Sequence, residues 1–70
     1  MEYAVVIERA GSNFSAYVPD LPGCIATGES TEDVESQIRE AIQFHLAGMR
    51  EDGEAIPKPS SSVNYVVVTA

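Results

Sequence analysis

The 70-residue sequence has one cysteine, one histidine and no tryptophan. Because Cys24 has no second cysteine to pair with, no disulfide can form within the chain, and a lone thiol suits a reducing compartment. One cysteine and one histidine also cannot fill a four-ligand structural zinc site. A domain of this size buries only about 60% of the surface of its unfolded chain. We therefore expect a partner subunit or another protein to supplement its core.

Long apolar runs are missing as well. The longest ones, residues 4–7 and 65–68, are far too short to cross a bilayer. The sequence opens with Met1-Glu2-Tyr3 and lacks the basic flank and apolar core of a signal peptide. These features predict a cytoplasmic protein.

Basic residues are few, since four Lys and Arg stand against eleven Asp and Glu, for a net charge of -7. Such a charge repels phosphate backbones and attracts basic surfaces. The sequence therefore predicts no direct nucleic-acid binding by this chain. Two interpretations of the acidity stay open: it serves solubility, or it serves recognition of a basic partner.

The first 28 residues carry a strand pattern. Residues 2–9 are rich in β-branched and aromatic types, and residues 14–18 resume the alternation after a turn at residues 10–13. The prolines at 19 and 22 end the hydrogen-bond ladder between these two strands because they lack an N–H donor. Residues 24–28 are short and partly apolar. We predict a hairpin followed by a third strand.

A helix is predicted from Ser30 to residues 51–52. Ser30 is a suitable N-cap, acidic residues occupy the first turn, and Gly53 is a suitable C-cap before two prolines. The exposed pair Glu35 and Arg39 has favourable i,i+4 spacing. Spacings of three and four place the following residues on one stripe that packs on the sheet: Val34, Ile38, Ala41, Ile42, His45 and Met49.

Residues 63–69 give the strongest strand signal in the chain. The predicted fold is therefore a two-layer α+β domain, β-β-β-α-β, with sheet order 3-2-1-4 and one helix on one face. In this order the last strand is an edge, yet both of its faces are largely apolar. We predict that a second subunit covers it, which makes the chain a homodimer or a higher oligomer.

Three parts of the sequence carry a family resemblance. They are the turn Asp20-Leu21-Pro22-Gly23-Cys24, the helix start Gly28-Glu29-Ser30-Thr31-Glu32-Asp33, and the helix exit Glu51-Asp52-Gly53-Glu54 with Pro57 and Pro59. Their joint occurrence resembles the HicB family of bacterial antitoxins over nearly the whole chain.

The resemblance implies a partial ribonuclease-H-like fold over residues 1–70. It also implies binding and neutralisation of a HicA-type toxin, a small basic protein that cleaves mRNA. Many members carry a C-terminal module that binds operator DNA. This sequence ends at Ala70, so we expect no such module within it. The alternative is a stand-alone oligomeric scaffold or small-ligand-binding domain without a toxin partner.

The sequence predicts no catalytic residues, no metal site and no cofactor. The acidic residues are scattered over strand ends, a turn and the polar side of the helix, whereas two-metal nucleases need converging carboxylates. His45 falls within the apolar stripe and Cys24 has no activating neighbour, which favours structural roles for both. Asp20 is expected to accept hydrogen bonds from the backbone amides that follow it in its turn, with direct contact to a partner as the alternative.

Two sets of residues are candidates for binding. Glu29, Glu32 and Glu35, at the start of the helix, are candidates for contact with a basic partner. Phe44 and Gly48 lie off the apolar stripe of the helix, where they either contact the flank of the fold or form a subunit interface. The candidate oligomer interface comprises Phe44, Gly48, Tyr65 and Val67.

Overall fold

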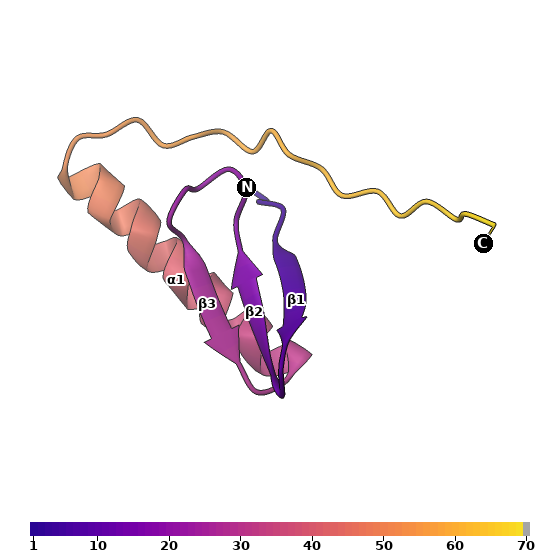
Figure 1. The fold of residues 1–70 in the computed structure, drawn as a ribbon. Coiled ribbons are helices and arrows are strands. Elements are labelled where there is room, and N and C mark those ends of the chain that lie inside the picture. The colour runs from indigo at the N-terminus through magenta and orange to yellow at the C-terminus, as the bar shows by residue number, and fades with distance from the viewer. Residues whose placement is uncertain (70) are drawn as a thin grey trace.

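The computed structural model describes residues 1–69 of the chain. This part contains the strands β1 (Val6–Ala10), β2 (Asn13–Tyr17) and β3 (Ile25–Gly28), followed by the helix α1 (Thr31–Glu51). The strands form one antiparallel sheet in the order β1-β2-β3. The helix runs diagonally across one face of this sheet (Figure 1). The α+β class is thereby confirmed.

The hairpin and the third strand form where the sequence predicts them. Val6 pairs with Tyr17 and Ala10 with Asn13, and Gly11 between them has a positive φ of 64° that suits a tight turn. The first strand is shorter than predicted, because the ladder begins at Val6 and not at Glu2.

The helix is capped as the sequence predicts. The Ser30 hydroxyl accepts a hydrogen bond from the Asp33 amide at 3.0 Å, and the Asp33 carboxylate accepts one from the Glu29 amide at 2.9 Å. These reciprocal bonds satisfy amides that have no partner within the helix. At the other end, Gly53 takes a positive φ of 70°. Both predicted ends are confirmed.

The helix meets the sheet closely at Gly28. A Cβ atom there would lie 2.5 Å from the Val34 nitrogen and 2.7 Å from its Cα, which no real side chain tolerates. Val34 is fully buried. The glycine at the end of β3 thus allows the helix to begin directly against the sheet, a role that the sequence analysis did not assign to it.

The core lies between the helix and the inner face of the sheet. Its buried members are Ala16, Val18, Leu21, Cys24, Val34, Ile38 and Leu46. Leu21 and Cys24 belong to the proline-bounded turn, which backbone hydrogen bonds tie to Val18: the Leu21 amide donates to the Val18 carbonyl, and the Val18 amide donates to the Cys24 carbonyl. The motif at residues 20–24 therefore contributes two side chains to the core.

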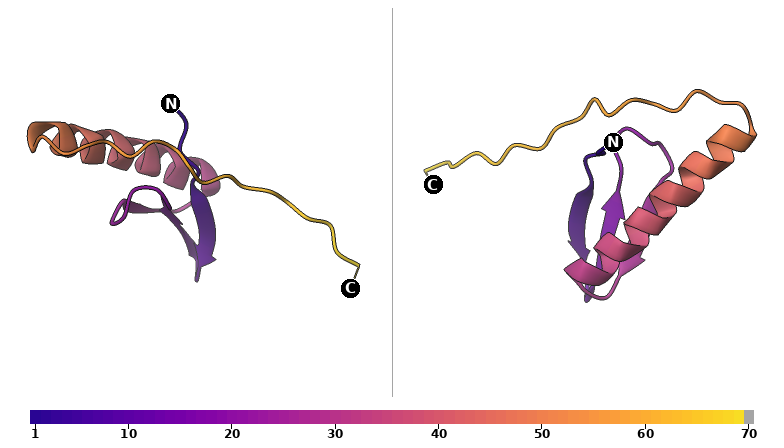
Figure 2. Two further views of the ribbon diagram at one scale, coloured as in Figure 1. Left: turned by 90° about the horizontal axis from the view of Figure 1, so that it is seen from above. Right: turned by 180° about the vertical axis from the view of Figure 1, so that it is seen from behind.

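The predicted fourth strand is wrong for the single chain. Residues 54–69 are extended but take part in no strand, and residues 57–69 pass over one end of the sheet and project beyond β1 (Figures 1 and 2). The predicted order 3-2-1-4 is therefore correct in its first three strands only. The physical reason is that a β-rich sequence forms a strand only when it reaches a partner edge, and this segment reaches none.

The projecting segment lengthens the molecule. The radius of gyration is 13.7 Å and the longest dimension is 48 Å. A compact chain of 70 residues has a radius of gyration of about 11 Å. The excess reflects residues that lie outside the packed body.

Candidate binding surfaces

The three acidic candidates lie at the exposed start of α1. Glu29 precedes the N-cap, Glu32 lies in the first turn and Glu35 in the second, and all three are exposed. Glu35 forms an ion pair with Arg39 at 3.4 Å, with both side chains about two-thirds exposed. Such a pair contributes little stability because water screens it. The charges are therefore available to a partner, with Glu35 partly compensated.

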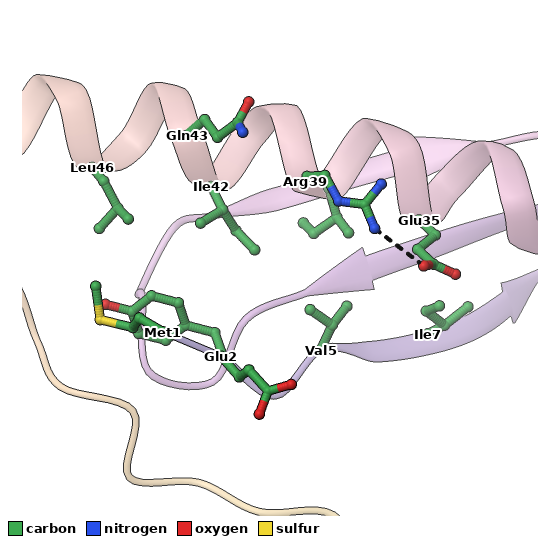
Figure 3. A pocket seen from close by; sticks show the side chains of 11 residues that line it. Met1, Glu2, Val5, Ile7, Glu35, Arg39, Ile42, Gln43 and Leu46 are labelled. Carbon is green, nitrogen blue, oxygen red and sulfur yellow. Dashed lines mark hydrogen bonds and ion pairs between the residues drawn. The ribbon is translucent and has the colours of Figure 1, made fainter.

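An apolar groove lies between α1 and the N-terminal strand, with a volume of about 620 Å³. Val5 and Ile7 point into it from the sheet side, and Ile42 and Leu46 from the helix (Figure 3). Glu35 and Arg39 lie along the same side of the helix. The sequence analysis missed this groove, because it assumed that the last strand would cover β1.

The opposite flank of the helix carries Phe44, whose side chain is 84% exposed. Ile25 of β3 is 70% exposed and lines the same shallow hollow. Gly48 lies one turn after Phe44 and lines a neighbouring hollow with it, and the space around Gly48 is open. The structure thus brings Phe44 and Gly48 together, whereas Tyr65 and Val67 lie on the projecting segment.

Asp20 holds the start of the C-terminal segment. Its carboxylate accepts hydrogen bonds from the backbone amides and the hydroxyls of both Ser60 and Ser61, at 2.8–3.0 Å. The Ser60 amide, then the Ser61 amide, then the Ser61 hydroxyl stabilise the ionised form and lower the pKa of Asp20 to about 2. Nearby, the Tyr3 hydroxyl donates to the Pro57 carbonyl.

This arrangement corrects the predicted role of Asp20. Its hydrogen bonds go to residues 40 and 41 positions away and not to amides of its own turn. The turn is closed instead by backbone groups, with the Cys24 amide donating to the Leu21 carbonyl at 3.0 Å. A single sequence gives no signal for a contact at this separation, beyond the general affinity of a carboxylate for unpaired amides.

The remaining reactive side chains do not converge. Cys24 is 3% exposed, and burial raises the pKa of its thiol, which keeps the thiol protonated. His45 is half-buried beside Phe44. Within residues 1–69, no three His, Cys, Asp or Glu side chains are close enough to hold a metal ion. Over the same residues, no helix has the length and apolar character that a membrane span needs.

The fold and its surfaces define a small α+β module whose exposed features are suited to binding macromolecules: an acidic helix start, an apolar groove beside an open strand, and an aromatic flank. The family model that describes the HicB-like antitoxin of bacterial toxin-antitoxin systems matches residues 3–69. The chain belongs to this family.

Relatives occur in a phage, a bacterium and an archaeon. The chain is 36% identical over 66 residues to an uncharacterized 14.9 kDa protein in the rep-hol intergenic region of Haemophilus phage HP1, with 94% of this chain and 50% of that protein covered. It is 36% identical over 58 residues to a UPF0150 protein of Helicobacter pylori, and 36% identical over 59 residues to one of Archaeoglobus fulgidus. These alignments cover 83% and 80% of this chain and 81% and 86% of the relatives. The chain thus spans half the length of the phage relative.

A solved structure shares the fold. A chain of the structure entitled "HicA3 and HicB3 toxin-antitoxin complex" superposes with a TM-score of 0.74 at 27% sequence identity. The superposition covers 86% of this chain and 70% of that one.

Proposed function

We propose that this chain is an antitoxin that binds and neutralises a small basic HicA-type toxin, an mRNA-cleaving protein, in the cytoplasm. The observation that carries the proposal is the family match over residues 3–69, which spans the whole folded body. The similarity to a chain of a toxin-antitoxin complex supports the kind of partner.

The charge of the chain supports the mode of recognition. A net charge of -7 attracts a basic protein, and exposed Glu29, Glu32 and Glu35 concentrate part of this charge at one end of the helix. Opposite charges accelerate encounter and orient the partners, while shape complementarity sets how long the complex lasts. A basic RNA-binding face that is covered in this way cannot reach RNA. The chain then acts as an inhibitor and not as an enzyme.

Charge reversal tests the acidic surface. The triple variant Glu29→Lys, Glu32→Lys and Glu35→Lys is expected to slow association with the toxin by about tenfold or more at low salt. The matched control reverses Glu51, Asp52 and Glu54, which are also exposed but lie at the other end of the helix. Stopped-flow mixing at two ionic strengths measures both variants.

The control separates local recognition from net charge. Both variants change the charge of the chain equally, so a larger effect of the first variant supports contact at the helix start. Equal rates for both variants and the parent chain, at either salt concentration, would mean that the acidity serves solubility alone.

Co-expression tests the function itself: the chain should restore growth to cells that make the toxin, and should co-purify with it. Continued growth arrest with no co-purification would contradict the proposal.

Self-association is a second proposed property, and the exposed apolar segment at residues 63–68 favours it. It is compatible with toxin binding, but it is also what a stand-alone scaffold would need. A neighbouring reading frame that encodes a basic protein of about 60 to 80 residues, the size of a minimal domain, favours the antitoxin. If the chain forms oligomers but binds no such toxin, the result would favour a role as a stand-alone scaffold.

A further inference from the structure

The sheet has an open edge at β1. Among residues 1–69 this strand pairs with β2 alone, so the N–H and C=O groups along its other side have no strand partner there. The apolar groove lies directly beside this edge, under the helix (Figure 3). The other edge, at β3, is bordered by a smaller hollow of about 490 Å³, which Ile25 and Phe44 line together with Thr27, Gln37 and Glu40. The groove at β1 therefore has more room for the side chains of an added strand.

The C-terminal segment has the sequence of a buried strand but is exposed. Val63 is 50% exposed, Tyr65 is 96% exposed and Val67 is 98% exposed, and the exposed fractions of Val66 and Val68 are 79% and 77%. Exposed β-branched and aromatic side chains in a row are a template for strand addition. Six residues at about 3.3 Å each span about 20 Å, slightly more than the five residues of β1.

The path of the segment points away from its own groove. Asp20 fixes Ser60 and Ser61, and the prolines at 57 and 59 restrict the preceding residues to extended conformations. The end of the chain continues outward past β1 (Figures 1 and 2). Among residues 1–69, no hydrogen bond involves a residue beyond Ser61. The hydrogen bonds to Ser60 and Ser61 thus fix the start of the segment and leave residues 63–68 exposed to another molecule.

We propose that the β1 edge and its groove receive residues 63–68 of a second copy of this chain. Each copy donates its segment to the other, so that both sheets gain a fourth strand and both grooves are filled. Exchange of identical elements gives a closed dimer, because every contact occurs twice. This inference rests on the self-association proposed above and is independent of toxin binding.

The two faces of the exchanged strand have different environments. Asn64 belongs on the solvent side of the sheet, which places Val63, Tyr65 and Val67 on the side that enters the groove. Val66 then shares the solvent side with Asn64. Substitutions at Val67 and at Val66 should therefore affect the dimer differently, whereas a contact without strand structure would not distinguish the two positions.

Cross-linking between different chains tests the exchange directly. In a Cys24→Ala background, one chain carries Val6→Cys and a second, tagged chain carries Val66→Cys. The two chains are unfolded and refolded together without toxin and treated with a short bismaleimide. Exchange predicts a product that contains one chain of each kind. The matched control replaces Val6→Cys by Glu40→Cys, on the β3 side of the helix, and should give no such product.

Other arrangements give different results. If each segment folds back on its own sheet, the mixture gives no mixed product, while a chain with both cysteines cross-links to itself at monomer mass. If copies associate through the Phe44 flank, light scattering reports a dimer without a Val6 to Val66 product. Either result overturns the exchange, and the second leaves self-association intact. Failure of toxin binding is measured separately and affects neither.

Alternate positions provide a second measurement. Val67→Asp places a charge in the groove and is expected to weaken the dimer by more than about tenfold, since a buried charge without a partner is costly. Val66→Asp, on the solvent side, is expected to leave the dimer within about threefold of the parent chain. The body stays folded in both variants because neither side chain contributes to its core. Equal weakening of the dimer in both variants overturns strand pairing.

Discussion

The packed body, residues 1–56, and the C-terminal segment, residues 57–69, use similar residues with opposite outcomes. Residues 3–7, which lead into β1, and residues 63–69 both consist mainly of β-branched and aromatic types. The first strand has β2 beside it and the helix above it, whereas the last segment contacts no strand in the single chain. Strand formation depends on a partner edge as much as on residue type. The segment is therefore a strand sequence that still needs an edge.

The comparison also separates stability from recognition. The body contains the capped helix and all seven buried core residues. The segment contains none of them, and yet the family match extends through it to residue 69. A segment that contributes no core to the single chain but belongs to the family domain is suited to contact with another chain.

The largest expected effect is the difference in unfolding free energy between a substitution in the core of the body and one in the C-terminal segment. Ile38 is 2% exposed, and Ile38→Ala should lower the free energy of unfolding by about 2–5 kcal/mol, enough to unfold much of so small a domain. Val67→Ala should change it by less than about 0.5 kcal/mol at concentrations where the chain is monomeric. Urea unfolding followed by circular dichroism measures both. A similar loss in both variants would mean that the segment packs on its own body.

Within the body, alanine substitutions at two glycines are expected to change the unfolding free energy in opposite directions. Gly28→Ala should lower the free energy of unfolding by about 1–3 kcal/mol, because its Cβ would overlap the Val34 backbone. Gly48→Ala should raise it by about 1 kcal/mol, since the space there is open and alanine favours the helix. Thermal unfolding measures both. Destabilisation by Gly48→Ala would show that another backbone packs closely at the Phe44 flank.

The smallest effect concerns the junction of the two regions. The pKa of Asp20 lies near 2, below its ordinary value of 3.8, so its contribution to holding Ser60 and Ser61 is complete above about pH 4. That contribution is lost as the pH falls through about 2, when the carboxylate is protonated. The carboxyl carbon shift, followed by NMR, should report this titration. Ser61→Ala should raise the pKa part of the way, and titration of the parent chain near 3.8 would contradict the anchor.

Much of the body could be predicted because its signals are local. The caps at Ser30 and Gly53 and the hairpin turn at Gly11 depend on neighbours in sequence, and the structure confirms all three. The close approach at Gly28 and the hydrogen bonds that Ser60 and Ser61 donate to Asp20 depend on contacts between separate parts of the chain. No local pattern encodes them. The fourth strand was predicted wrongly for the single chain because residue preference indicates a strand without indicating its partner.

The candidate binding residues were predictable only in part. Exposure of Phe44 and of the acidic helix start follows from helical spacing, but the apolar groove becomes visible only when β1 is seen without a neighbour. The unpaired edge of β1 connects the two regions. The body has an edge that can accept a strand, and the C-terminal segment has a strand sequence without a neighbour.

Amide hydrogen exchange of the full chain tests this connection most directly. Across a dilution series followed in parallel by light scattering, the alternate amides of residues 64–68 that face β1 are expected to be protected in the dimer and to lose protection together as it dissociates, while the amides of α1 keep theirs. Amides at residues 64–68 that exchange freely in a chain shown to be dimeric would contradict the account, because the copies would then associate without pairing this segment.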